Sequence, residues 1–213
     1  MSASPSDPRS PEADRTIATP PPRPRLLAFA GSLRAASYNR RLVPLLAQGA
    51  REAGADVDLI ELRDYPLPVY DGDIEAAGMP DNVYRLQALM AASDGLLIST
   101  PEYNGSMPAL VKNTLDWMSR ATVEGKSGTL LFQDKMAGIV SASPGPLGGI
   151  RSLIVLRDAL SKLGLLVVPQ QVAVGNAAER LPDTGVLADE RLRSAVLNVG
   201  AAVVRHLCKG AKA

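Results

Sequence analysis

Short, nearly continuous apolar runs alternate along the chain with longer segments in which apolar residues recur every three or four positions. An unbroken apolar run is typical of a strand buried on both faces of a parallel sheet, and the longer period is typical of an amphipathic helix. The pattern predicts strands at 26–30, 57–60, 95–100, 137–142 and 165–168. It predicts helices at 39–54, 82–92, 108–120, 149–163 and 189–208. This alternation indicates an α/β domain with a doubly wound, five-stranded parallel sheet and helices on both faces.

Residues at the predicted helix ends agree with this assignment. Ser106 can cap the helix that follows it, Pro108 suits a first helical turn, and Asp189 can cap the last helix. Gly164 follows the helix before the last strand, where glycine commonly ends a helix. Pro44 conflicts with the pattern, because a proline inside a helix removes a backbone donor, and we expect a kink there.

The first 24 residues differ in composition from the rest of the chain. They contain seven prolines, and Ile17 is their only aliphatic residue apart from alanine. Such a segment cannot bury enough apolar surface to fold alone, so we predict a disordered Pro-rich tail at 1–24 and one folded domain at 25–213. A proline-rich ligand for a partner domain is the alternative. The tail lacks the apolar centre of a secretory signal, which favours a cytoplasmic protein.

Composition narrows the class of protein. The 213 residues are 46% hydrophobic, which is enough for a buried core, and the formal net charge is +1. A nearly neutral chain argues against nucleic acid as a partner, since a phosphate backbone calls for a clustered basic surface. No stretch is apolar for long enough to span a bilayer, so we expect no membrane partner. The single cysteine, Cys208, excludes an internal disulfide and fits the reducing cytoplasm.

The segment 31–39, between the first predicted strand and a helix, is rich in groups that bind anions. A helix start offers unpaired N–H groups and a positive dipole end; Ser32, Ser37 and Asn39 add polar side chains, and Arg34 adds a planar cation. The three-glycine dinucleotide pattern is absent, which favours a phosphate monoester. The alternative is that Ser37 or Asn39 only caps the helix and that Arg34 points to solvent.

A second segment in the same context runs from Pro101 to Pro108, between a predicted strand and a predicted helix. The carboxyl ends of parallel strands meet at one edge of the sheet, where open α/β folds bind their ligands. Together the two loops predict a pocket for a phosphorylated, planar ligand.

Both loops also carry recognisable motifs. Residues 31–39 read GSLRAASYN and residues 101–117 read PEYNGSMPALVKNTLDW. These segments resemble the GSLRxxSxN loop and the PEYNxSxPxxLKNxxDW segment of the NAD(P)H-dependent FMN reductase family, the flavodoxin-like group that includes chromate, quinone and azo-dye reductases. Val111 stands where leucine is usual, which is a conservative change. The resemblance extends from about residue 26 to residue 179.

The resemblance implies a fold, a cofactor and a reaction. The fold is flavodoxin-like, with strand order 2-1-3-4-5 and FMN at the point where the order reverses. NADPH or NADH is the co-substrate, and the small-molecule electron acceptor is a quinone, an azo compound, a metal oxyanion or free flavin. Members of the family work as homodimers or homotetramers, so we expect a homo-oligomer.

The resemblance also implies further cofactor contacts. Backbone N–H groups around Tyr103, Asn104 and Gly105 approach the flavin ring, and a third loop, 141–151, matches the family's Gly-Gly-x-Arg segment at the pyrimidine end. Beyond the first loop, the predicted cofactor-binding residues are Pro101, Glu102, Tyr103, Asn104, Gly105, Ser141, Ser143, Gly145, Gly148 and Gly149. Family members often carry tyrosine at the position of Gly105, so the glycine either opens the acceptor side of the pocket or is neutral.

Several residues near these loops have more than one interpretation. Arg151 serves the cofactor, a subunit contact or only its helix face. Trp117 belongs to the core or stacks on the flavin, with core packing the favoured reading. The polar residues of the same helix are favoured as solvated or capping groups over ligand contacts; they are Lys112, Asn113 and Asp116.

The chain lacks the residues for several other chemistries. His206 is the only histidine and falls in the last predicted helix, so neither a Ser-His or Cys-His relay nor a zinc site can be assembled. Hydride transfer between a nicotinamide and a flavin needs orientation more than a protein acid or base, and we therefore predict no catalytic side chain. Cys208 is interpreted as an inert structural thiol.

We interpret the chain as an FMN-dependent NAD(P)H oxidoreductase. The alternative is a flavodoxin-type electron carrier without a nicotinamide site; such carriers tend to be strongly acidic, whereas this chain has 22 acidic and 23 basic residues. A regulatory or scaffold domain of the same fold would leave both polar loops unexplained.

Overall fold

A computed structural model describes residues 23–182, 184 and 186–210. Its parallel sheet contains β1 (Arg25–Ala30), β2 (Asp56–Ile60), β3 (Gly95–Ser99), β4 (Met136–Ala142) and β5 (Leu166–Val174). The strand order is β2-β1-β3-β4-β5, which confirms the predicted flavodoxin-like arrangement. The predicted tail falls almost wholly on residues 1–22, outside the described part of the chain.

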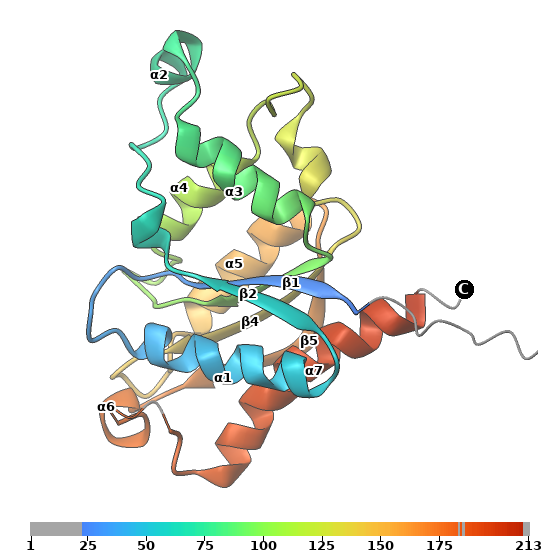
Figure 1. The fold of residues 1–213 in the computed structure, drawn as a ribbon. Helices are drawn as coiled ribbons and strands as arrows, with labels where there is room; N and C mark the ends of the chain where they lie inside the picture. The colour runs from blue at the N-terminus through green and yellow to red at the C-terminus, as the bar shows by residue number, and fades with distance from the viewer. Residues whose placement is uncertain (1–22, 183, 185, 211–213) are drawn as a thin grey trace, which may run out of the picture.

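Helices cover both faces of the sheet (Figure 1). On one face lie α1 (Tyr38–Glu52) and α7 (Glu190–Gly210), and on the other lie α3 (Asp81–Ala91), α4 (Ala109–Met118) and α5 (Ile150–Lys162). Short elements that the hydrophobic pattern did not predict complete the fold: η1 (Leu62–Asp64), α2 (Gly72–Ala77), η2 (Gly128–Leu131) and α6 (Ala177–Arg180). No helix in the described ranges is both long and apolar enough to cross a bilayer.

The central strands are buried on both sides because alternate residues point into different layers. In β1, Leu26 and Ala28 pack with α1 and α7, whereas Leu27 and Phe29 pack with the helices of the opposite face. All four side chains are at most 1% exposed. This two-sided burial explains why the strand reads as an unbroken apolar run.

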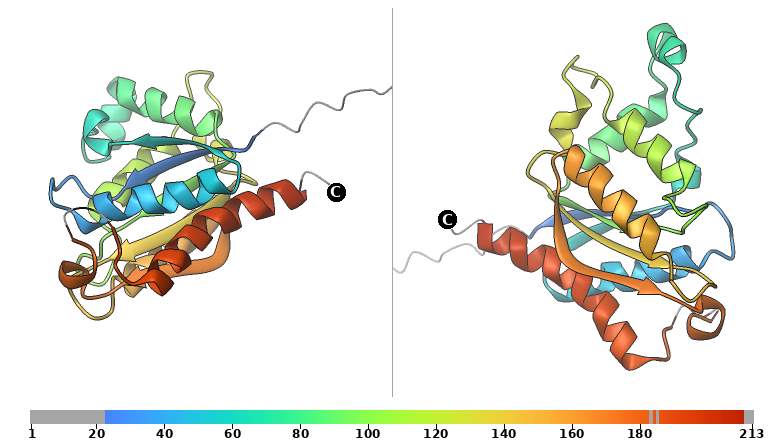
Figure 2. Two further views of the ribbon diagram at one scale, coloured as in Figure 1. Left: turned by 60° about the horizontal axis from the view of Figure 1, so that its bottom comes forward. Right: turned by 180° about the vertical axis from the view of Figure 1, so that it is seen from behind.

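Glycines allow α1 and α7 to pack with their backbones in contact (Figure 2). A Cβ atom on Gly49 of α1 would lie 2.0 Å from the carbonyl oxygen of Leu197, and a Cβ atom on Gly200 of α7 would lie 2.2 Å from that of Leu46. Any larger residue must therefore push the two helices apart.

Strand β5 extends well beyond the predicted 165–168. Its pairing with β4 shifts between Ala137 and Ile139, and the bulged part of β5 contains Pro169. A proline is tolerated there because β5 is an edge strand. Arg157 of α5 donates hydrogen bonds to the carbonyl oxygens of Val167 and Val168 at 3.0 and 2.8 Å, which provides donors for backbone groups next to the bulge. The strand bends along its length (Figure 2, right).

The observed helix ends confirm the signals at Asp189 and Gly164, whereas Pro108 is the N-cap residue of α4 and precedes its first turn. Asp189 caps α7, since its Oδ1 accepts hydrogen bonds from the N–H groups of Arg191 and Leu192. Gly164 follows α5 with a φ of +100°. Helix α1 continues through Pro44, which lies on its exposed side. Ser106 does not cap α4, because the helix begins two residues later than that role requires, after Pro108.

We predict that Gly200→Ala lowers the free energy of unfolding by about 2–4 kcal/mol. Alanine is intrinsically the better helix former by about 1 kcal/mol, but the clash with the backbone of α1 outweighs that gain. Urea unfolding without added flavin measures the change. Gly72→Ala is the control, because a Cβ atom there meets nothing within 4 Å. An unchanged midpoint for Gly200→Ala would contradict a tight crossing.

Candidate active site

The three predicted loops meet at the carboxyl edge of the sheet around a small cavity of about 70 Å³. Its walls come from segments far apart in the sequence, which the strand order β1-β3-β4 places side by side. The predicted site residues that line it are Ser32, Arg34, Ser37, Asn39, Pro101, Glu102, Tyr103 and Ser143. A neighbouring cavity of about 280 Å³ shares Ser32, Arg34 and Tyr103 and is bounded by Pro108–Leu110 at the start of α4.

The first loop presents unpaired groups to this cavity. Ser37 is the N-cap residue of α1, yet its side chain forms no capping hydrogen bond, although the residue is only 4% exposed. The Arg34 guanidinium has no hydrogen-bond or ion-pair partner among the described residues. The N–H groups of Tyr38 and Asn39 begin α1 and have no acceptor within the helix. This arrangement can bind an anion through several donors at once.

Two further arginines hold the backbone of that loop. Arg40 donates to the carbonyl oxygens of Arg34 and Ala35 at 3.4 and 3.3 Å, and it also pairs with Glu61 at 2.9 Å. Arg63 donates to the carbonyl oxygen of Leu33. The loop is therefore fixed through its backbone, without any use of the Arg34 side chain. No local motif in the sequence marks Arg40 or Arg63, because each acts on backbone atoms of the loop.

Asn39 connects α1 to two strands. Its Oδ1 accepts hydrogen bonds from the hydroxyl of Ser99 and the N–H of Ala142, both at 2.9 Å, and its Nδ2 donates to the carbonyl oxygen of Ala142 at 2.9 Å. The residue is 2% exposed. The sequence allowed the interpretation that Asn39 caps α1, but the structure shows that it does not. Its amide is largely committed to bracing the ends of β3 and β4 beneath the cavity.

The second loop is a tight reverse turn. Tyr103 and Ser106 exchange two backbone hydrogen bonds of 3.0 Å, and the central residues Asn104 and Gly105 have φ values of 50° and 77°. Positive φ at both positions is the property of a type I′ turn, for which Asn-Gly is the favoured sequence. A Cβ atom on Gly105 would meet nothing within 4 Å, so the constraint there is the backbone conformation and not space.

Glu102 and Arg151 link the second loop to the third. Arg151 donates from Nε to Glu102 Oε1 at 2.7 Å and from its backbone N–H to Oε2 at 3.1 Å. The Glu102 side chain is 8% exposed, whereas that of Arg151 is 59% exposed. The structure shows a role for Arg151 that none of the three interpretations included. It forms an ion pair with Glu102 that anchors the start of α5.

This pairing changes the titration of Glu102. Burial raises the pKa of the carboxyl, but the hydrogen bonds and charge of Arg151, together with the backbone N–H groups of Arg151 and Ser152, outweigh burial. The pKa therefore lies below its ordinary value of 4.5. The carboxylate also lies at the N-terminus of α5, where the helix dipole favours negative charge.

The backbone of the third loop reverses direction at two glycines. Gly148 and Gly149 have φ values of 63° and 89°, and a Cβ atom on Gly148 would lie 2.6 Å from the nitrogen of Gly175. The Ser141 hydroxyl donates to the carbonyl oxygen of Gly148 at 2.7 Å, and Ser143 Oγ accepts from the N–H of Gly145 at 3.3 Å. Ser141 thus supports the loop from beneath, whereas Ser143 also lines the cavity.

Polar residues of α4 hold the chain that precedes α2. Asn113 accepts from the N–H of Tyr70 at 2.8 Å and donates to the carbonyl oxygen of Pro68 at 2.7 Å, and Trp117 donates to the same carbonyl at 2.8 Å. Trp117 is fully buried, in agreement with its reading as core. Lys112 pairs with Asp116 one turn along the exposed side of the helix. The role of Asn113 was missed because its partners lie more than 40 residues away.

A doubly wound sheet whose carboxyl edge carries a polar loop at a helix start, a tight turn and a glycine loop is typical of a flavodoxin-like flavoprotein. The pattern of the NADPH-dependent FMN reductase family matches residues 24–179, most of the chain. The chain belongs to that family. It is an oxidoreductase that uses FMN and NAD(P)H, as predicted.

Individual relatives agree with this assignment. The chain is 34% identical over 173 residues to an NAD(P)H-dependent FMN reductase from Pseudomonas aeruginosa, which covers 81% of this chain and 89% of that protein. It is 33% identical over 172 residues to a quinone reductase from Escherichia coli, and this match covers 78% of this chain and 86% of that protein. Among solved structures, FerB from Paracoccus denitrificans, a flavoenzyme NAD(P)H:(acceptor) oxidoreductase, matches with a TM-score of 0.72 at 27% identity, covering 85% of this chain and 96% of that chain.

We predict that Glu102→Gln lowers the free energy of unfolding by about 1–2 kcal/mol at pH 7, because it removes a charge-assisted hydrogen bond and a charge at a helix start. A carboxyl whose pKa is lower in the folded state stabilises the fold above its unfolded pKa and loses that contribution as the pH falls through the folded pKa. The difference between the two proteins should therefore shrink as the pH falls below 4.5, the ordinary pKa of the carboxyl.

Thermal unfolding between pH 3 and pH 8 measures this dependence. Glu124→Gln is the control, because Glu124 pairs with Lys126 on the exposed surface, where an ion pair contributes little. A difference between wild type and Glu102→Gln that stayed constant across the range would show that the Glu102 charge does not stabilise the fold.

Proposed function

We propose that this enzyme transfers electrons from NAD(P)H to small quinone-type acceptors at the carboxyl edge of its sheet. The observation that carries the proposal lies at the start of α1, where the Arg34 guanidinium has no partner among the described residues and the N-cap residue Ser37 forms no capping hydrogen bond through its side chain. Such a cation, next to free N–H donors of a helix start, is suited to the phosphate of FMN. Relatives that are named quinone reductases support the choice of acceptor.

The residues at this edge fit FMN in three parts. Ser32, Arg34 and Ser37 would hold the phosphate, with Asn39 bracing the helix start that supplies the N–H donors. The turn from Pro101 to Gly105 would border the ring, and the glycine loop would border its pyrimidine end through the segment that contains Ser141, Ser143, Gly145, Gly148 and Gly149. In this assignment Glu102 would hold these two loops together through its hydrogen bond with Arg151.

FMN, when bound, supplies the chemistry that accepts a hydride and passes electrons on. The residues of the chain would position the cofactor: the turn at Asn104 and Gly105 would border the ring edge, and the loops would shield one face from water. No side chain is assigned a proton-transfer role. His206 lies on α7 with its Nδ1 against the carbonyl oxygen of Ala202, far in the sequence from the loops.

The acceptor would approach over the second cavity. Its rim includes Leu33 and Tyr103, which are 46% and 47% exposed, and Leu110 lines its wall. An apolar rim of this kind suits a neutral quinone ring better than a metal oxyanion. We also propose a homodimer or homotetramer and a cytoplasmic location, on the resemblance and on the single cysteine. A flavodoxin-type carrier is less favoured, because the family of this chain is defined by reductase activity.

We predict that Arg34→Ala weakens FMN binding about 10- to 100-fold and leaves riboflavin binding unchanged. The change removes a charge-assisted hydrogen bond that only the phosphate can accept, and the fold does not depend on the Arg34 side chain. Fluorescence titration of the apoprotein with each flavin measures both affinities. Arg205→Ala, at an exposed position on α7, is the control. Equal losses for FMN and riboflavin would remove Arg34 from the phosphate site.

We predict that NAD(P)H and the acceptor use the open face of the same pocket in turn. Steady-state rates at several acceptor concentrations should then give parallel double-reciprocal lines, because the oxidised nicotinamide leaves before the acceptor enters. Enzyme treated with one equivalent of NADPH and freed of nicotinamide should still convert one equivalent of acceptor. Intersecting lines, with nicotinamide and acceptor bound together, would show that a second acceptor site exists.

A further inference from the structure

The turn at the tip of the second loop places two unpaired groups next to each other in the chain. Asn104 is exposed, and its side-chain amide forms no hydrogen bond within the described ranges. The backbone N–H of Gly105 has no acceptor in those ranges either, because the two hydrogen bonds of this turn join Tyr103 and Ser106. The nitrogen of Gly105 and the side-chain carbon Cγ of Asn104 are therefore both open to reaction.

Glycine at position 105 removes the usual obstacle to a reaction between these two groups. A side chain on the residue after an asparagine shields the backbone nitrogen, whereas Gly105 has none, and a Cβ atom there would meet nothing within 4 Å. The space beside this nitrogen is thus open to water. No other asparagine of the sequence is followed by glycine. Asn104 is therefore the position at which attack by the backbone on a side-chain amide is least hindered.

Asn176 shows that the backbone conformation alone does not create this combination. Its φ of 51° is close to the 50° of Asn104. The next residue, however, is Ala177, whose N–H donates to the carbonyl oxygen of Ser143 at 3.0 Å. That nitrogen is both engaged and shielded by a methyl group, so Asn176 is an internal comparison with nearly the same φ.

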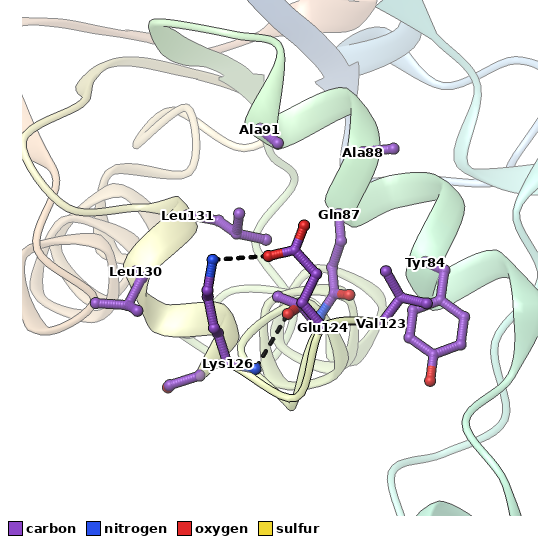
Figure 3. A pocket seen from close by; sticks show the side chains of 11 residues that line it. Tyr84, Gln87, Ala88, Ala91, Val123, Glu124, Lys126, Leu130 and Leu131 are labelled. Carbon is purple, nitrogen blue, oxygen red and sulfur yellow. Dashed lines mark hydrogen bonds and ion pairs between the residues drawn. The ribbon is translucent and has the colours of Figure 1, made fainter.

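A second exposed turn, in the segment 122–126, has a similar glycine but a different residue before it. Gly125 has a φ of 74° and follows Glu124. The Glu124 carboxylate points toward Lys126 and pairs with it at 2.7 Å (Figure 3). An ionised carboxylate repels a nucleophile and carries no amine that could leave. This turn therefore lacks the reactive carbon that Asn104 supplies.

We propose that Asn104 and Gly105 form a site of spontaneous deamidation, a reaction that makes asparagine one of the thermolabile residues of proteins. The Gly105 nitrogen loses its proton to hydroxide and forms a bond to Asn104 Cγ. The bond from Cγ to the side-chain nitrogen breaks, and this nitrogen takes a proton from water and leaves as ammonia. Water then opens the resulting succinimide ring at either carbonyl carbon, which gives aspartate or isoaspartate. The net reaction consumes one water and releases one ammonia, without oxidant or reductant.

The hydrogen bonds of the turn oppose this reaction, because the peptide group between Asn104 and Gly105 must rotate before its nitrogen reaches Cγ. Both bonds between Tyr103 and Ser106 are 3.0 Å long. A ligand that rests on the turn and keeps it closed should slow the reaction further. FMN would be that ligand, and this step rests on the proposed function, in which FMN borders the turn.

The product differs from Asn104 in charge and, for isoaspartate, in backbone length. Either product adds a negative charge to the turn that would border the flavin ring. Isoaspartate also inserts one carbon atom into the backbone, so the two hydrogen bonds between Tyr103 and Ser106 cannot both keep their geometry. We therefore expect the modified enzyme to bind FMN more weakly. This consequence rests on the proposed function, whereas the deamidation itself does not.

Peptide mapping by mass spectrometry tests the site. The FMN-loaded enzyme and the same enzyme freed of FMN are incubated at pH 8 and 37 °C. The peptide that contains Asn104 should gain about 1 Da as the amide becomes an acid, and it should do so several-fold faster without FMN. The peptide that contains Asn176 should keep its mass. No gain at Asn104, or an equal gain at Asn176, would overturn the proposal, and equal rates with and without FMN would overturn the protection by the cofactor.

Two variants complete the test. Gly105→Ala places a methyl group beside the nitrogen without a clash and should slow the mass gain at least about 10-fold. Conversion at the wild-type rate would overturn the role of Gly105. Asn104→Asp imitates one product and should bind FMN about 3- to 10-fold more weakly than the wild type. Asn198→Asp, at an exposed position of α7, controls for the added charge.

The two variants separate this proposal from the proposed function. Equal FMN affinities of Asn104→Asp and the wild type would overturn the effect of the modification on the cofactor. A wild-type enzyme that bound no FMN would contradict the proposed function, and the mass gain at Asn104 would still decide whether the turn deamidates.

Discussion

The buried amide of Asn39 is the constraint on which the candidate site depends. Its three hydrogen bonds join the first turn of α1 to the ends of β3 and β4, which carry the second and third loops. Each such bond contributes about 1 kcal/mol, but the larger effect is geometric, because the bonds set the position of the helix start relative to two other loops. A parallel sheet alone brings strand ends together; it does not fix the distance between a helix start and the loops beside it.

Around the Asn39 amide, some polar groups hold the loops in place, and others are left free to serve the proposed ligand site. Arg40, Arg63 and Arg151 are paired with carbonyl oxygens or carboxylates and so hold loops in place. Arg34 and Ser37 lack such partners and face the cavity. Charge alone does not distinguish these groups. A guanidinium that already neutralises Glu61 or Glu102 has little left to offer a phosphate, whereas an unpaired one gains a strong interaction when the anion arrives.

The hydrophobic pattern predicted the fold because the unbroken apolar runs of the strands and the three- to four-residue period of the helices are both strong in this chain. The ends of the long helices fall within two residues of their predicted positions, whereas β5 ends six residues beyond its predicted end at residue 168. Pro169 and the glutamines after it read as the end of a strand, and only the tertiary contacts of Arg157 show how the strand continues. The site loops were recognised from local motifs. The pairs that position them join residues 49 and 103 positions apart, and no local pattern encodes such pairs.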